Sequence, residues 1–78
     1  MLGEENGSAH PSFFCPMSRQ VMTDPVTCCD GLTYDRPHIE AWLQDHDTSP
    51  LTNARLASRT LVPNIALRNA IEEWQQQQ

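Results

Sequence analysis

Residues 24–43 constrain the fold of this chain more than any other stretch, because they predict a β-hairpin followed directly by a helix. Two short β-prone runs flank Asp30-Gly31, and a glycine at position 31 accepts a positive φ without a Cβ clash, so the pair is a strong turn signal. Asp35 can cap a helix whose first turn contains Pro37, where a missing N–H costs nothing. We therefore expect the chain to be organised around a ββα unit.

Apolar residues at helical spacing indicate the faces that two helices bury. Ile39, Trp42 and Leu43 fall at i, i+3 and i+4 in the first helix. The second helix, which Asn64 is expected to cap, has an apolar stripe at i, i+3, i+4 and i+7 that consists of Leu67, Ala70, Ile71 and Trp74.

The segment Leu56–Val62, ahead of that second helix, predicts a short third strand that Pro63 ends. The expected fold class is therefore a small α+β domain: a ββα centre with a three-stranded antiparallel sheet, two long loops and a C-terminal helix. The boundaries that we expect are a flexible polar tail over residues 1–12, a folded domain over 13–74, and a linker or frayed end over 75–78.

Two long loops flank the ββα unit, one over Phe14–Met22 and one over Gln44–Arg55. A twelve-residue loop in so small a domain is usually functional. Met17 and Pro50 are apolar residues near the two loop tips, and Trp42 lies on the helix between the loops. Together they could form one shallow apolar groove, which is the usual shape of a protein-docking site, although each could also be an ordinary packed residue.

Cysteine and histidine usage argues against disulfides and against zinc. The chain has three cysteines, an odd number, and two of them are adjacent, so a disulfide framework is not expected. Two structural zinc ions need about eight ligands at spacings such as Cys-x-x-Cys. The chain offers three cysteines and three histidines without one such pair, so we predict no metal and no cofactor. A cysteine nucleophile is not indicated either, because nothing supplies an oxyanion site.

Composition and charge exclude further classes of function. The net charge is −5, with ten acidic residues against five scattered basic ones, whereas nucleic-acid binding depends on basic clusters that face phosphates. We see no signal peptide and no apolar run long enough to span a bilayer, so we expect no membrane association and an intracellular location, cytoplasmic or nuclear. A protein partner fits this composition best.

Six motifs, taken in order and at their approximate spacing, resemble the U-box family. They are Phe14-Cys15-Pro16-Met17, Asp24-Pro25-Val26, Asp30-Gly31 with Thr33-Tyr34-Asp35, Ile39-x-x-Trp42-Leu43, Ser49-Pro50-Leu51-Thr52, and Leu61-x-Pro63-Asn64-x-x-Leu67. Each motif is weak alone, but the ordered set is specific and covers nearly the whole predicted domain. The resemblance implies a RING-like fold that has lost its zinc ions. It also implies a ubiquitin ligase that recruits a ubiquitin-conjugating enzyme to its two loops and central helix.

The resemblance assigns roles to individual residues. Met17 matches the apolar contact of the first loop, Pro50 the proline of the second loop, and Trp42 the exposed helix position between them. Arg19 matches a variable position at the rim of this docking surface. Asn53 matches the linchpin position, where many family members carry a basic residue, so this chain departs from them there.

In place of zinc, hydrogen bonds and salt bridges are expected to tie the two loops. The residues that we expect in this network are Asp24, Asp30, Ser49, Thr52 and Asn64.

The implied mechanism is not covalent. The domain would bind a conjugating enzyme already charged with ubiquitin and bias the flexible thioester conjugate toward a closed arrangement, which makes attack by a substrate lysine easier. Substrates would be held by domains outside this chain, and a second copy of the chain is a further candidate partner. The alternative hypothesis is a U-box-like binding or dimerisation module without ligase activity.

Overall fold

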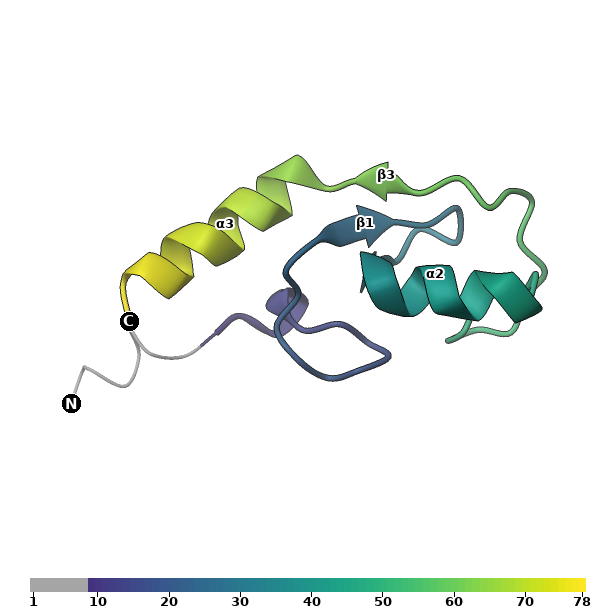
Figure 1. The fold of residues 1–78 in the computed structure, drawn as a ribbon, viewed down its shortest axis with the longest axis horizontal. Helices are drawn as coiled ribbons and strands as arrows, with labels where there is room; N and C mark the ends of the chain where they lie inside the picture. The colour runs from purple at the N-terminus through teal and green to yellow at the C-terminus, as the bar shows by residue number, and fades with distance from the viewer. Residues whose placement is uncertain (1–8) are drawn as a thin grey trace.

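The computed structural model describes residues 9–78 and has the predicted α+β fold (Figure 1). Three short strands form one antiparallel sheet in the order β2-β1-β3, with one helix after the hairpin and one at the C-terminal end. In chain order the elements are a 3-10 turn η1 (Pro11–Phe13), β1 (Pro25–Thr27), β2 (Thr33–Asp35), α2 (Arg36–Asp45), β3 (Val62–Pro63) and α3 (Ile65–Gln76).

The hairpin forms where the sequence predicts it. The Gly31 N–H donates to the Cys28 carbonyl at 3.0 Å, and the Cys28 N–H donates to the Leu32 carbonyl at 2.9 Å. Gly31 has a φ of 84°, the left-handed conformation that favours glycine. This turn sets the register of the sheet, in which Val26 lies opposite Tyr34. Both side chains are fully buried.

Helix α2 begins as predicted, but Asp35 acts differently. Asp35 occupies the N-cap position, yet its side chain makes no capping hydrogen bond. Its Oδ1 accepts instead from the backbone N–H groups of Thr23 (3.2 Å) and Asp24 (2.9 Å), so the carboxylate ties the first loop to the helix start. The predicted side-chain cap is therefore wrong, because two amides distant in sequence outcompete the local donors.

The third strand is shorter and later than predicted. It covers only Val62–Pro63 and pairs with β1, so the predicted strand over Leu56–Val62 is wrong except at its last residue. Side chains hold the preceding segment: Arg59 donates to the Leu43 carbonyl, and the Cys29 thiol donates to Ser58 O at 3.1 Å. Pro63 is tolerated because β3 is an edge strand.

Helix α3 presents the predicted stripe to the core. The Asn64 side chain accepts from the Leu67 N–H at 3.1 Å and so caps the helix, as predicted. Ile71 is buried, and the Trp74 ring lies 5.9 Å from the Phe13 ring, so the helix also packs against η1. The buried apolar core consists of Cys15, Met22, Val26, Cys28, Tyr34, Ile39, Leu43 and Ile71.

The ordered elements extend past both predicted boundaries of the folded domain. η1 begins at Pro11, two residues before position 13, and α3 continues to Gln76, two residues past position 74. Residues 1–8, which make up most of the predicted tail, lie outside the described residues. Over residues 9–78, no helix is long and apolar enough to cross a membrane.

Candidate functional site

The first loop is closed by its own backbone. Phe14 and Val21 form an isolated bridge, the Cys15 N–H donates to the Gln20 carbonyl at 2.8 Å, and the Arg19 N–H donates to the Cys15 carbonyl at 2.7 Å. Arg19 has a φ of 63°, an uncommon conformation for a residue with a Cβ, and its side chain is exposed. Met17 is half-buried and packs against the core, so it is both a packing and a surface residue.

The second loop is closed in a similar way. Thr48 and Arg55 form a bridge, and the Asn53 N–H donates to the Ser49 carbonyl at 2.9 Å. The buried Ser49 Oγ accepts from the backbone N–H groups of Leu51 (3.2 Å) and Thr52 (3.1 Å). The loop therefore turns around one hydroxyl.

This turn sets the exposure of the loop residues that follow Ser49. Pro50 is half-buried, whereas Leu51 is 50% exposed and Asn53 is exposed with a φ of 64°. An asparagine tolerates this left-handed conformation better than most residues do.

Trp42 connects helix α2 to the second loop. Its indole Nε1 donates to the Thr48 carbonyl at 2.6 Å, and its ring stacks on His46 with a centroid distance of 3.6 Å. The indole is half-buried against the core. Trp42 therefore packs against the core with part of its ring and leaves the rest of the ring at the surface.

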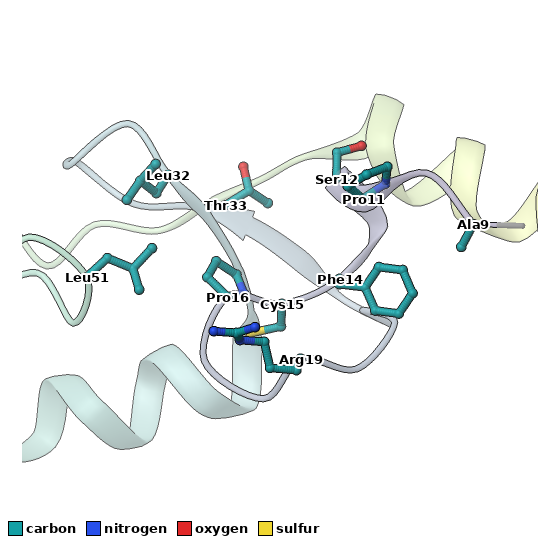
Figure 2. A pocket seen from close by; sticks show the side chains of 10 residues that line it. All are labelled: Ala9, Pro11, Ser12, Phe14, Cys15, Pro16, Arg19, Leu32, Thr33 and Leu51. Atoms are coloured by element: carbon teal, nitrogen blue, oxygen red, sulfur yellow. The ribbon is translucent and has the colours of Figure 1, made fainter.

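The two loops approach each other beside an open hollow of about 850 Å³ (Figure 2). Pro16 and Arg19 come from the first loop, Leu51 from the second, and Leu32 and Thr33 from the hairpin. Among the predicted docking residues Arg19 lines this hollow, while Met17, Trp42 and Pro50 do not. The hollow thus lies at the flank of the predicted surface.

Leu51 and Phe14 are surface apolar residues that our sequence analysis missed. They are 50% and 38% exposed, and both line the hollow. For Leu51 a signal was present, since it is an isolated apolar residue in a polar loop, next to Pro50. For Phe14 the sequence carries no such signal, because phenylalanine is among the residues most often buried in folded proteins.

Asp30 ties the hairpin turn to strand β2. The buried Tyr34 hydroxyl donates to Asp30 Oδ2 at 2.7 Å, and the Leu32 N–H donates to Asp30 Oδ1 at 2.9 Å. Burial alone raises the pKa of Asp30, but these hydrogen bonds, with a contribution from Ser49, lower it by more, so the pKa lies below its usual value. Burial, together with the bond to Asp30, raises the pKa of Tyr34 well above its usual value.

Asp24 and Asp35 link the first loop to α2. Arg36 Nε donates to Asp24 Oδ2 at 2.7 Å, and this bond raises the pKa of Arg36. The Asp35 N–H donates to the buried Cys15 Sγ at 3.3 Å. Asp35 is 7% exposed and holds two loop amides, so it is the network residue that the sequence analysis assigned to helix capping instead.

The remaining two expected network residues, Thr52 and Asn64, make contacts that do not join the two loops. Thr52 Oγ1 accepts from the Ala54 N–H at 3.3 Å within the second loop. Asn64 caps α3, and its N–H donates to the Pro25 carbonyl at 2.9 Å, which joins the helix start to β1. Neither residue bridges the two loops directly.

The three cysteines are all free, with Cys15 and Cys28 buried and Cys29 exposed. Burial raises the pKa of the Cys28 thiol, which disfavours the thiolate. Within residues 9–78, no group of three or more His, Cys, Asp or Glu side chains is placed to share a metal ion. The side chains around the two loops instead form a surface with apolar patches and an exposed arginine, which suits noncovalent protein docking.

Comparison with known proteins identifies a family. The model of the U-box domain matches residues 10–78 of the chain. The chain is 50% identical over 72 residues to U-box domain-containing protein 37 of Arabidopsis thaliana, and this match covers 91% of the chain and 18% of that relative. It is 57% identical over 63 residues to putative U-box domain-containing protein 58 of the same plant, covering 80% of the chain and 15% of the relative.

A relative in rice has a comparable sequence identity to the chain. U-box domain-containing protein 70 of Oryza sativa subsp. japonica is 48% identical over 75 residues, which is 94% of the chain and 9% of that relative. The chain thus spans less than a fifth of the length of each of these three relatives.

Proposed function

Because this chain belongs to the U-box family, we propose that it is a ubiquitin ligase module that recruits a ubiquitin-charged conjugating enzyme and promotes transfer of ubiquitin to a substrate lysine. The docking surface that we assign comprises Met17, Arg19, Trp42 and Pro50, and we add Leu51 to it. Substrates would be selected by parts of a longer protein, since the relatives are much longer than this chain.

One observation carries this proposal: side chains from both loops line one surface. Leu51 of the second loop and Pro16 and Arg19 of the first line the same hollow, while the Trp42 indole is hydrogen-bonded to the start of the second loop. Apolar area in this arrangement, rimmed by an exposed arginine, supports a docking site for a protein loop. The guanidinium of Arg19 has no ion-pair partner among residues 9–78, so it is free to meet a carboxylate of the partner.

The reaction that we assign proceeds without a covalent intermediate on this domain. The thioester carbon is attacked by the lysine amine, and the conjugating enzyme's cysteine leaves as the thiolate. Asn53, exposed at the end of the second loop, would contact ubiquitin and the conjugating enzyme and favour their closed arrangement. Fixing the thioester in one orientation raises the rate because less conformational freedom remains to be lost.

A single-turnover discharge assay tests the proposal. Conjugating enzymes from a panel are loaded with ubiquitin and mixed with free lysine, with and without the domain. We expect at least one of them to discharge faster with the domain and more slowly with Pro50→Ala, whereas Glu73→Ala, an exposed substitution on α3, behaves as the native chain. Binding without acceleration would favour the module that only binds or dimerises. Neither binding nor acceleration with any conjugating enzyme would contradict the assigned surface.

A further inference from the structure

His46 covers one face of the Trp42 indole. The two rings are 3.6 Å apart between centroids and lie within 6° of parallel, which is direct van der Waals contact over the ring faces. The two residues are four positions apart, one at the last full turn of α2 and the other at its C-cap. One face of the half-buried indole is therefore occupied by its own chain.

The position of the imidazole is fixed by the end of the helix. His46 leaves the helix with an extended backbone, φ −135° and ψ 151°, and its N–H donates to the Trp42 carbonyl at 3.0 Å. Its Nδ1 lies 3.1 Å from the same carbonyl oxygen. A carbonyl oxygen only accepts, so Nδ1 carries the proton and the ring is held back over the last turn of the helix.

The edge of the indole is fixed as well. Nε1 of Trp42 donates to the Thr48 carbonyl at 2.6 Å, at the first residue of the bridge that closes the second loop. Rotation about either side-chain torsion of Trp42 would break this hydrogen bond or the stack. The indole is thereby confined to one orientation before any partner arrives.

We propose that His46 is a positioning residue: it holds the Trp42 indole in the orientation in which the conjugating enzyme meets it. This inference rests on the proposed function, since it assigns a partner to Trp42. An anchor that is already ordered loses less side-chain freedom on binding, so affinity rises without any new contact to the partner. Trp42 makes the contact with the conjugating enzyme, and His46 restricts the indole to one orientation.

Three substitutions separate stacking from direct contact. His46→Ala removes the stack, and His46→Phe keeps a flat ring over the indole while removing Nδ1. Gln44→Ala is the matched control, because Gln44 is exposed on the same last turn of α2. Affinities are measured by titration calorimetry against the conjugating enzyme that binds the native domain most tightly in a panel.

We expect His46→Ala to weaken binding roughly three- to tenfold, the order of effect that follows from freeing one large side chain. His46→Phe should restore affinity to within about twofold, since an aromatic ring again covers the indole. Gln44→Ala should bind as the native chain does. In a Trp42→Ala background, His46→Ala should cause no further loss, because a positioning residue has nothing left to position.

A spectroscopic readout reports the stack itself. The carbon-bound imidazole protons of His46 should resonate upfield, owing to the indole ring current, and should return to ordinary values in Trp42→Ala. Ordinary shifts in the native chain that do not change in Trp42→Ala would show that the two rings do not stack in solution, and would overturn the positioning role.

The outcomes also separate this inference from the proposed function. Equal losses from His46→Ala in the native and Trp42→Ala backgrounds, or failure of His46→Phe to restore affinity, would overturn the positioning role. If Trp42→Ala binds normally while Pro50→Ala does not, the docking surface stands and this inference falls. If the domain binds no conjugating enzyme, the proposed function fails first.

Discussion

At the scale of single residues, the proposed docking surface combines Met17, which also packs against the core, with residues of the second loop. Met17 is half-buried against the core, whereas Pro50 lies in a loop that the Ser49 hydroxyl holds in place. Substitutions at the two positions should therefore differ in their effect on stability even where their effect on binding is similar.

We expect Met17→Ala and Pro50→Ala each to weaken binding of a conjugating enzyme by about 1–2 kcal/mol, as interface anchors do. Pro50→Ala should change the free energy of unfolding by less than about 0.5 kcal/mol. Met17→Ala should also lower it, by about 1 kcal/mol, because part of the thioether is packed. Calorimetric titration and thermal melting of both variants check this. Two early-melting variants with normal binding would place both residues in the core only.

In the proposed mechanism Asn53 takes the linchpin position, where many members of the family carry a basic residue. Arginine presents five donors in a rigid fork, whereas asparagine offers two donors and one acceptor on a short stem. Asn53→Arg should speed ubiquitin discharge several-fold, since lowering the activation free energy by ~1.4 kcal/mol would speed it tenfold. Asn53→Ala should slow discharge. Position 53 has a φ of 64°, which arginine and alanine adopt less readily than asparagine does. The discharge rates of the variants and the native chain are therefore compared at saturating concentrations of the domain, where a change in affinity does not affect the rate. Equal rates for all three side chains would remove Asn53 from the mechanism.

At the scale of elements, one carboxylate in the hairpin turn ties that turn to strand β2. Asp30 accepts from Tyr34 and Leu32, and its pKa is lowered by these bonds. A lowered pKa means that Asp30 stabilises the fold at pH values above the unfolded pKa of about 3.9, and that this stabilisation is lost as the pH falls through the lower folded pKa.

Asp30→Asn should therefore lower the free energy of unfolding by about 1 kcal/mol at pH 7, the size of a lost charge-assisted hydrogen bond. The difference from the native chain should shrink as the pH falls below the unfolded pKa of about 3.9 toward the lower pKa of the folded state. Urea unfolding between pH 7 and pH 3 measures this, with the exposed Asp45→Asn as the control. A difference that stays constant over this range would assign the effect to shape rather than charge.

At the scale of the whole molecule, hydrogen bonds and a small apolar core hold the two loops. Asp35 and the Asp24–Arg36 pair lie where the chain before β1 meets the start of α2, and the Ser49 hydroxyl closes the second loop. A fold stabilised in this way should not depend on metal.

The melting temperature should therefore be the same with and without EDTA. Structural zinc in small domains contributes an apparent ~10–16 kcal/mol, so chelation would unfold a zinc-dependent domain outright. Thermal melting followed by circular dichroism, with elemental analysis of the purified chain, checks this expectation. A large drop in the midpoint, or stoichiometric zinc, would contradict it.

The sequence alone determined the features that depend on local physics. Gly31 predicted the hairpin because only a residue without a Cβ adopts its φ freely, and Asn64 predicted the start of α3 because its amide reaches an amide three residues on. The ordered motifs also predicted the U-box family, which the comparison confirmed.

Only the tertiary structure decided features that join distant segments. The Asp35 carboxylate could accept hydrogen bonds either from its own helix or from distant backbone amides. It accepts from Thr23 and Asp24, because both N–H groups point at Oδ1 in the folded chain. Residues 56–61 do not form a strand because Arg59 and Ser58 are held by other elements. The stack of His46 on Trp42 depends on how α2 ends and where the Thr48 carbonyl lies. These contacts compete with local preferences, and their outcome depends on positions in space that no local sequence pattern contains.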